Sequence, residues 1–182
     1  MKFITPILHK EQTGLAKFCD DVTQLFLRWM NNPAVYRFLG DREITFYSIR
    51  DAQNHVMAIE KESLLIVAKE EDVWIPIGYI CLNLRPRHKI ANFTIVIGEE
   101  KFRDKGHGKT ATSLTLTYAF KQLGLFAVHL VVSKNNQNAI AVYEKTGFKV
   151  CGIRHGARME DGERTDEILM ECTQDMYYNR RR

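Results

Sequence analysis

The sequence predicts an α/β protein of the α+β type, with a mixed, mostly antiparallel central sheet of about seven strands flanked by about four helices. Runs rich in β-branched residues alternate with segments whose apolar residues recur at helical spacing. Three of these runs follow one another in mid-chain, which favours an antiparallel meander. The length of 182 residues suits one full hydrophobic core, so we expect a single domain over residues 1–182.

The N-terminal part should form one strand and two helices. Residues 2–8 are predicted as the strand, and apolar residues at helical spacing predict a helix over Val22–Trp29, with the aspartates at 20–21 as candidate caps. This helix should end before Pro33. Residues 48–51 match a capping box and open a second helix, whose expected inner face is Ala52, His55, Val56 and Ile59.

The meander is predicted from residues 64–68, 77–84 and 90–97, with Gly78 marking a bulge. The next helix is expected over residues 110–123, ending at Gly124. Its predicted apolar face is Leu116, Ala119, Phe120 and Leu123.

The C-terminal part is expected to add one buried strand, one helix and a closing hairpin. The strand is predicted at residues 127–132, and the helix over 136–146 should end at Gly147. Residues 148–153 and 166–172 should pair as the hairpin, with 160–162 in its connection.

Composition indicates a globular protein, with 45% hydrophobic and 26% charged residues. No run is long enough to span a membrane and the N-terminus lacks a long apolar segment, so we expect a cytoplasmic protein without a membrane partner. The four cysteines are scattered in apolar surroundings and should be reduced core thiols: Cys19, Cys81, Cys151 and Cys172. No cluster has metal-ligand spacing, so we expect no metal.

The most informative motif is the run Arg103-Asp104-Lys105-Gly106-His107-Gly108-Lys109-Thr110, which lies between a predicted strand and a predicted helix. Glycines let the backbone approach an anion closely, and a helix N-terminus adds partial positive charge. The spacing fits neither a P-loop nor a dinucleotide-binding turn. The run therefore predicts a phosphate cradle of another kind.

Residues 136–148 supply a second motif, Asn-x-x-Ala-x-x-x-Tyr-x-x-x-Gly-Phe. Together with the Arg-x-x-Gly-x-Gly run, it resembles the GNAT (GCN5-related) N-acetyltransferase superfamily, whose order of elements also matches along nearly the whole chain. Two flanking segments, 28–33 and 152–170, resemble the ribosomal-protein N-terminal and spermidine acetyltransferase branch more loosely.

The resemblance implies acetyl-CoA as co-substrate. It implies that backbone amides of Arg103, Asp104, Lys105, Gly106, His107 and Gly108, with Lys109 and Thr110, hold the pyrophosphate. The strand edge at Ile95, Val96 and Ile97 would pair with the pantetheine arm, and the N–H of Ile97 would point at the thioester carbonyl. The imidazole of His107 is expected at the surface, without a role as base.

Two residues of the second motif carry predicted side-chain roles. Asn136 should cap its helix and also contact the coenzyme. Tyr143 lies two helical turns on, so it shares nearly the same face. A phenol with a pKa of about 10 is protonated at neutral pH, so Tyr143 is the candidate general acid for the leaving thiolate.

The general base stays open in the sequence. Many relatives carry a glutamate on the strand before the phosphate loop, whereas residues 91–94 hold no carboxylate. A water chain anchored by Asn92 or Thr94, or a carboxylate from the variable helices, would then carry the proton. Acceptor specificity should come from residues 37–48 and 155–164, whose mixed charges identify no substrate.

The leading hypothesis is an N-acetyltransferase that transfers acetyl to a primary amine by direct attack in a ternary complex. The acceptor is a protein N-terminus, a polyamine or another small amine. No cysteine falls in either motif, so an acyl-cysteine route has no support.

Two other classes compete with this hypothesis. A non-catalytic CoA-binding regulatory module is the alternative, motivated by the missing glutamate, although the retained Tyr143 counts against it. The net charge of +4 and the Arg180-Arg181-Arg182 end suggest an RNA-associated protein, but no RNA-binding aromatic motif accompanies them, so we expect no nucleic-acid partner. A homodimer is left open.

Overall fold

The computed structural model describes residues 4–18, 22–36 and 48–180. The chain forms two compact units, the first of Met1–Cys81 and Ile95–Leu114 and the second of Leu82–Thr94 and Thr115–Arg182. Strands β4 (Val73–Arg85) and β5 (Ile90–Ile97) and helix α4 (His107–Thr117) each pass from one unit into the other.

The strands form an eight-stranded sheet in the order β1-β2-β3-β4-β5-β6-β8-β7. β5 pairs with β6 (Ala127–Ser133) in parallel, and the pairs β1–β2, β2–β3, β3–β4, β6–β8 and β7–β8 are antiparallel. The mixed, mostly antiparallel α+β architecture predicted from the sequence is therefore confirmed, with one strand more than expected.

The predicted opening strand is wrong in its position. Residues 2–3 of the predicted strand lie outside the described residues, and residues 4–7 form no strand; the chain instead forms a hairpin of β1 (Leu8–Lys10) and β2 (Thr13–Ala16), and β2 is buried. Pro6 supplies no backbone N–H, so it cannot donate to a sheet ladder, and the first pairing bond comes from Ile7, whose N–H donates to the carbonyl of Leu15 (2.7 Å).

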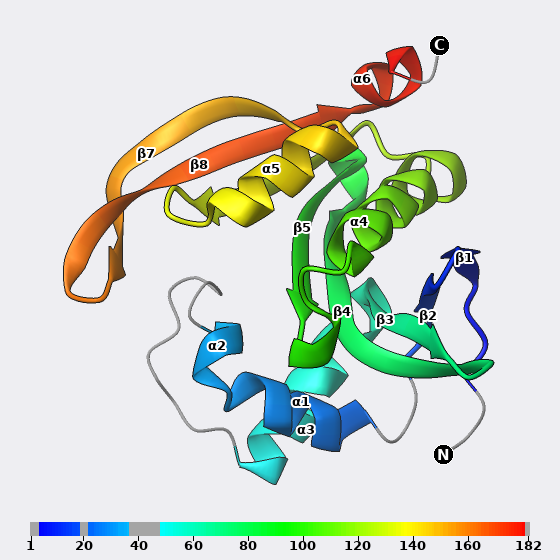
Figure 1. The fold of residues 1–182 in the computed structure, drawn as a ribbon. Coiled ribbons are helices and arrows are strands. Elements are labelled where there is room, and N and C mark those ends of the chain that lie inside the picture. Colours follow the sequence, from blue (N-terminus) through cyan, green and yellow to red (C-terminus); the bar gives the residue numbers. More distant parts are fainter. Residues whose placement is uncertain (1–3, 19–21, 37–47, 181–182) are drawn as a thin grey trace. The chain divides into compact units, whose positions relative to one another are not determined.

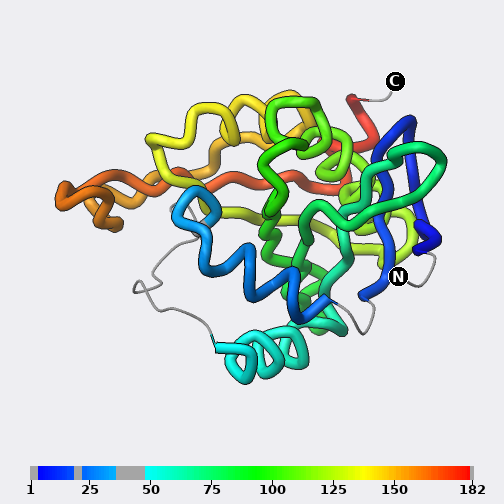
Figure 2. The backbone as a smooth tube through the Cα atoms, turned by 60° about the horizontal axis from the view of Figure 1, so that its bottom comes forward, coloured from blue at the N-terminus to red at the C-terminus, as the bar shows by residue number. Residues whose placement is uncertain are grey.

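Helix α1 (Val22–Met30) confirms the predicted helix, and α2 (Pro33–Tyr36) is a further single turn. The aspartates predicted as caps lie outside the described residues. α3 (Ile49–Ile59) opens with the predicted capping box, in which Ser48 and Asp51 bond to each other's backbone N–H. α1 and α3 lie against each other, as Figure 2 shows.

The core of the first unit gathers around Phe26 of α1, whose ring lies 4.5 Å from that of Tyr79 between centroids. β3 (Ser63–Glu70) and β4 form the predicted antiparallel pair. Their register shifts where Ile66 faces Gly78 and Val67 faces Pro76, so Ile77 is the extra residue of a bulge beside Gly78. The predicted bulge is confirmed.

Helix α4 begins at His107, three residues before the prediction, and continues into a π-helical turn at Tyr118–Gln122. Leu116, Ala119 and Phe120 are buried as expected, and Gly124 (φ +61°) ends the helix. Leu123 is 37% exposed, so its place in the predicted apolar face is wrong. The π turn changes the spacing of the last residues, which turns Leu123 off that face.

The second unit holds β6, α5 (Gln137–Thr146), β7 (Lys149–Glu160), β8 (Glu163–Thr173) and the unpredicted α6 (Gln174–Asn179). β7 and β8 form a long curved hairpin, and α5 lies along it (Figure 1). The strands of the hairpin are longer than predicted, because the charged composition of their outer residues is typical of a connecting loop. Only Asp161 and Gly162, both at positive φ, make the turn.

The prediction of core thiols is only partly right. Cys172 is buried and Cys81 is partly buried, and burial raises the pKa of both thiols. Cys151 is exposed on the edge strand β7, so its prediction as a core residue is wrong, and Cys19 lies outside the described residues. Among the residues that the structure describes, no helix is long and apolar enough to cross a membrane.

Candidate active site

The glycine run forms the turn into α4 that the sequence predicts. Gly106 has φ +84°, and the first backbone bond into the helix comes from Thr110, whose N–H donates to the carbonyl of Gly106 (3.0 Å). Within the described part of the chain, the N–H groups of residues 104–109 have no hydrogen-bond partner. A row of unpaired N–H groups at a helix N-terminus is an anion-binding arrangement.

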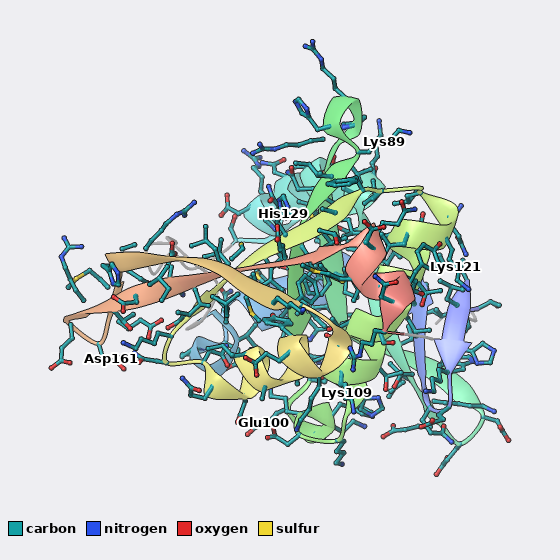
Figure 3. The ribbon with its side chains drawn as sticks, turned by 90° about the horizontal axis from the view of Figure 1, so that it is seen from above. Lys89, Glu100, Lys109, Lys121, His129 and Asp161 are labelled. Carbon is teal, nitrogen blue, oxygen red and sulfur yellow. The ribbon has the colours of Figure 1, made fainter. Side chains whose placement is uncertain are left out.

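The surface over this row is open. A Cβ atom built on Gly106 would meet no atom within 4 Å, and one on Gly108 would meet only Cγ1 of Ile97, at 3.9 Å. The side chains of Asp104, Lys105 and Lys109 are exposed, and Figure 3 shows Lys109 at the start of α4. The two lysines add positive charge beside the free N–H groups.

Arg103 differs from the following residues of the run because its backbone N–H and its side chain are both hydrogen-bonded. Its N–H donates to the carbonyl of Glu100 (3.0 Å), so the free row begins one residue later. Its guanidinium turns back to the end of β5, where Nε donates to the carbonyl of Ile97 (3.2 Å) and an Nη donates to that of Gly98 (3.4 Å). The side chain of Arg103 therefore ties the phosphate loop to the strand before it.

The imidazole of His107 is partly buried, so the expectation that it lies at the surface is only partly right. Its Nδ1 lies 2.8 Å from Oγ1 of Thr13 in β2, and its ring meets that of Phe102 edge-on. Burial, with the nearby charge of Lys105, lowers the pKa of His107 below its usual 6.5. The neutral ring thus anchors the first turn of α4.

A lowered pKa of His107 predicts a pH dependence of stability. His107 binds a proton more tightly in the unfolded chain than in the folded protein. Its contribution to the free energy of unfolding is therefore complete above about pH 6.5 and is lost as the pH falls towards the lower pKa of the folded state. We expect the free energy of unfolding to fall less between pH 7 and 5 in His107→Asn than in wild type, as measured by urea titration. Equal slopes would contradict the buried, neutral state of His107.

The end of β5 presents its backbone in alternation. The carbonyl of Val96 lies against Gly78 of β4, and the N–H of Gly98 donates to the carbonyl of Ile77 (2.9 Å). Alternate residues of a strand direct these groups to opposite edges, so Ile95 and Ile97 direct theirs away from β4. Pairing with β6 covers only Ile90 to Asn92. The edge predicted to hold the pantetheine arm therefore offers the backbone of Ile95 and the N–H of Ile97, whose carbonyl already accepts from Arg103, but not the backbone of Val96.

Asn136 caps α5 as predicted, because its Oδ1 accepts from the N–H of Ala139 (3.2 Å). The ring of Tyr143 meets those of Phe93 and Phe148 edge-on, with centroids 6.2 and 5.8 Å away. Its hydroxyl makes no hydrogen bond within residues 4–18, 22–36 and 48–180. Burial raises the pKa of Tyr143 to about 12. Tyr143 is thus a protonated phenol whose donor has no protein partner there.

A family model for the acetyltransferase (GNAT) domain matches residues 14–149, which is most of the chain. The chain belongs to the GNAT acetyltransferase family. Both motifs lie within the matched segment of this GNAT domain.

Named relatives agree with this assignment. The chain is 34% identical to the spermidine N(1)-acetyltransferase of Escherichia coli K12 over 90 residues, which are 50% of this chain and 48% of the relative, so the match spans about half of that enzyme's length. It is 26% identical to the spermidine N(1)-acetyltransferase of Vibrio cholerae serotype O1 over 165 residues, 88% of this chain and 76% of the relative.

A crystal structure of the spermidine N-acetyltransferase from Vibrio cholerae in complex with CoA and spermine has the same fold. Its TM-score is 0.81 at 22% identity, covering 93% of this chain and all of the other. At this identity the likeness concerns the fold alone.

One cluster in this GNAT domain was missed by sequence reasoning. Glu99 lies two residues after the end of β5, and its Oε1 accepts from Nε1 of Trp29 in α1 (2.8 Å) and pairs with Arg28. Trp29 reads in the sequence only as a core residue of its helix. Seventy residues separate it from Glu99, so no local pattern links the two.

Two segments are predicted to recognise the acceptor, residues 37–48 and 155–164. Most of residues 37–48 lies outside the described chain. Residues 155–164 form the outer part of the β7–β8 hairpin, where the carboxylate of Asp166 accepts from the N–H of Gly156 (3.0 Å) across a bulge. The exposed residues 85–89 form a basic turn, which ends at Lys89 directly before β5 (Figure 3). No group of three or more potential metal ligands is found among the described residues.

Proposed function

We propose that this GNAT domain is an acetyl-CoA-dependent N-acetyltransferase, which acts on a primary amine by direct attack in a ternary complex. The observation that carries the proposal is the row of N–H groups over residues 104–109, which have no partner among the described residues and open α4 inside the family match. Such a row suits a pyrophosphate, because each N–H can donate to an oxygen without moving the backbone.

Specific residues hold the coenzyme in this proposal. Backbone N–H groups from Asp104 to Lys109 bind the pyrophosphate, with Arg103 and Thr110 fixing the two ends of the loop. The backbone of Ile95 and Ile97 pairs with the pantetheine arm, and Val96 shapes the strand between them. The side chain of Asn136 contacts the coenzyme through Nδ2, since Oδ1 already caps α5.

The chemistry assigned to the protein is donation of two hydrogen bonds. The N–H of Ile97 stabilises the oxyanion that develops when the amine attacks the thioester. The hydroxyl of Tyr143 donates to the departing thiolate, and its pKa of about 12 keeps it protonated at neutral pH. The amine loses its proton through water held by Asn92 or Thr94, both exposed, or to a carboxylate of another element.

We propose a polyamine or another small amine as acceptor. Support comes from the two spermidine acetyltransferases that the chain matches and from the flanking segments of the same branch. We also propose that residues 1–182 act as one acetyltransferase domain, because the family match runs through segments of both compact units. A cytoplasmic location stays a prediction, and a homodimer stays open.

Acetyl-CoA should raise the melting temperature of the protein. A ligand at a hundred times its dissociation constant adds about 2.7 kcal/mol to the free energy of unfolding, which corresponds to roughly 5–10 °C for a chain of this length. Thermal melts with and without millimolar acetyl-CoA check it. A folded protein whose melting temperature does not move would contradict coenzyme binding.

The test of the whole proposal is turnover of acetyl-CoA with a panel of amines: diamines and polyamines, amino sugars and N-terminal peptides. We expect CoA release above the hydrolysis background with at least one amine of the panel. Coenzyme binding without turnover of any amine would replace the enzyme by the alternative, a CoA-binding regulatory module.

A further inference from the structure

Glu99, two residues after the end of β5, holds its carboxylate in a fixed place. The N–H groups of Gly98 and Glu99 both donate to the carbonyl of Ile77, at 2.9 and 3.1 Å. Oε1 accepts from the indole N–H of Trp29 at 2.8 Å. Backbone and side chain of Glu99 are therefore both anchored by hydrogen bonds.

Trp29 is a rigid support for this carboxylate. Its side chain is 1% exposed, and its ring packs against that of Phe26, with centroids 5.8 Å apart. The indole also lies so close to Gly98 that a Cβ atom there would overlap its ring. The indole N–H cannot follow a moving carboxylate, so it defines where Oε1 sits.

Arg28 is the labile partner of Glu99. Its side chain is 62% exposed, against 23% for that of Glu99, and it pairs with the same Oε1 that Trp29 binds. Among the described residues Oε2 has no hydrogen-bond partner. An exposed pair of this kind contributes little to stability, so a competing cation can displace the guanidinium at small cost.

The place of Glu99 relates it to the reacting atoms. It stands two residues after Ile97, whose N–H is assigned to the thioester carbonyl, and two residues span at most about 7 Å. The nitrogen that attacks the thioester must be neutral, so the carboxylate of Glu99 does not suit it. The carboxylate suits a second nitrogen of the acceptor that stays protonated as an ammonium ion.

We propose that Glu99 binds a second, cationic nitrogen of the acceptor and that Arg28 occupies this carboxylate in the substrate-free protein. The proposal rests on the proposed acetyltransferase function and names its acceptor class as amines with at least two nitrogens. Trp29 is the positioning residue, since it holds the carboxylate without contacting the acceptor.

The test compares 1,4-diaminobutane with 1-aminobutane, which differ by the second nitrogen alone, in wild type, Glu99→Gln and Arg28→Ala. The amide of Gln still accepts from Trp29 and lacks the charge. We expect the kcat/KM ratio of diamine to monoamine to fall about tenfold or more in Glu99→Gln, the worth of one charge-assisted hydrogen bond. The ratio should rise about two- to fivefold in Arg28→Ala, because a surface competitor is gone.

A purely structural ion pair would behave differently. Loss of either partner would then lower kcat/KM for both amines by the same factor, or it would lower the diamine-to-monoamine ratio in both variants. Either result overturns the proposal. If the wild-type protein acetylates no amine, that result contradicts the proposed function and leaves the role of Glu99 to a separate measurement. Calorimetric titration of the diamine into wild type and Glu99→Gln then tests Glu99 alone, and equal affinities overturn its role.

Discussion

Replacement of Tyr143 by Phe is expected to lower kcat by roughly 10²- to 10⁴-fold, the usual worth of a general acid, while the fold and coenzyme affinity stay near wild type. The substitution removes one donor and almost no volume. The ring keeps its edge-on contacts with Phe93 and Phe148. No hydrogen bond within the described chain is lost, because the hydroxyl has no partner there.

Single-turnover measurement of the Tyr143→Phe variant separates the chemical step from product release, which otherwise hides part of the effect. Tyr118, a helical tyrosine outside both motifs, supplies the matched control, and Tyr118→Phe should leave the chemical step at its wild-type rate. An unchanged chemical step in Tyr143→Phe would make Tyr143 a packing residue and leave protonation of the thiolate to solvent.

Gly106→Val is expected to weaken acetyl-CoA binding about a hundredfold or more and to abolish the thermal shift. The Cβ position of Gly106 faces open space, so the valine side chain fits in the free protein. It would occupy the space that a ligand bound over the row of N–H groups needs. Loss of two charge-assisted hydrogen bonds, at about 1.5 kcal/mol or more each, accounts for the factor. The structure adds a cost that the sequence hides, since φ +84° strains any β-branched residue by about 1–3 kcal/mol.

Gly162→Val is the matched control for this strain. Gly162 has φ +86°, and its Cβ position also meets nothing within 4 Å. Both variants should lose similar amounts of unfolding free energy in urea titrations, but only Gly106→Val should lose coenzyme affinity in calorimetry. Equal affinities in the two variants would move the loop out of the binding site.

Elements with strong local signals could be predicted from the sequence. β5 has the predicted ends, because its β-branched run is bounded by charged turns. α5 is fixed by Asn136 at its start and Gly147, at φ +115°, at its end. The glycine run could be placed at a helix N-terminus for the same reason, although α4 starts inside the run rather than after it.

The rest depends on contacts between distant residues. The hairpin of β1 and β2 replaces the predicted strand, because Pro6 interrupts the ladder and β2 finds its partner in β3. β7 and β8 extend well beyond their apolar residues, since bonds such as that from Gly156 to Asp166 hold strands that composition marks as loop. The contact of Trp29 with Glu99 joins two elements and leaves no periodic trace in either.

Product analysis with acetyl-CoA labelled in the acetyl group tests the central claim most directly. We expect wild-type protein and an amine of the panel to yield equal amounts of free CoA and labelled N-acetylamine, with no label bound covalently to the protein at any time. Acetyl label bound covalently to the denatured protein during turnover would contradict direct attack, and bound acetyl-CoA that yields neither product with any amine would contradict the transferase.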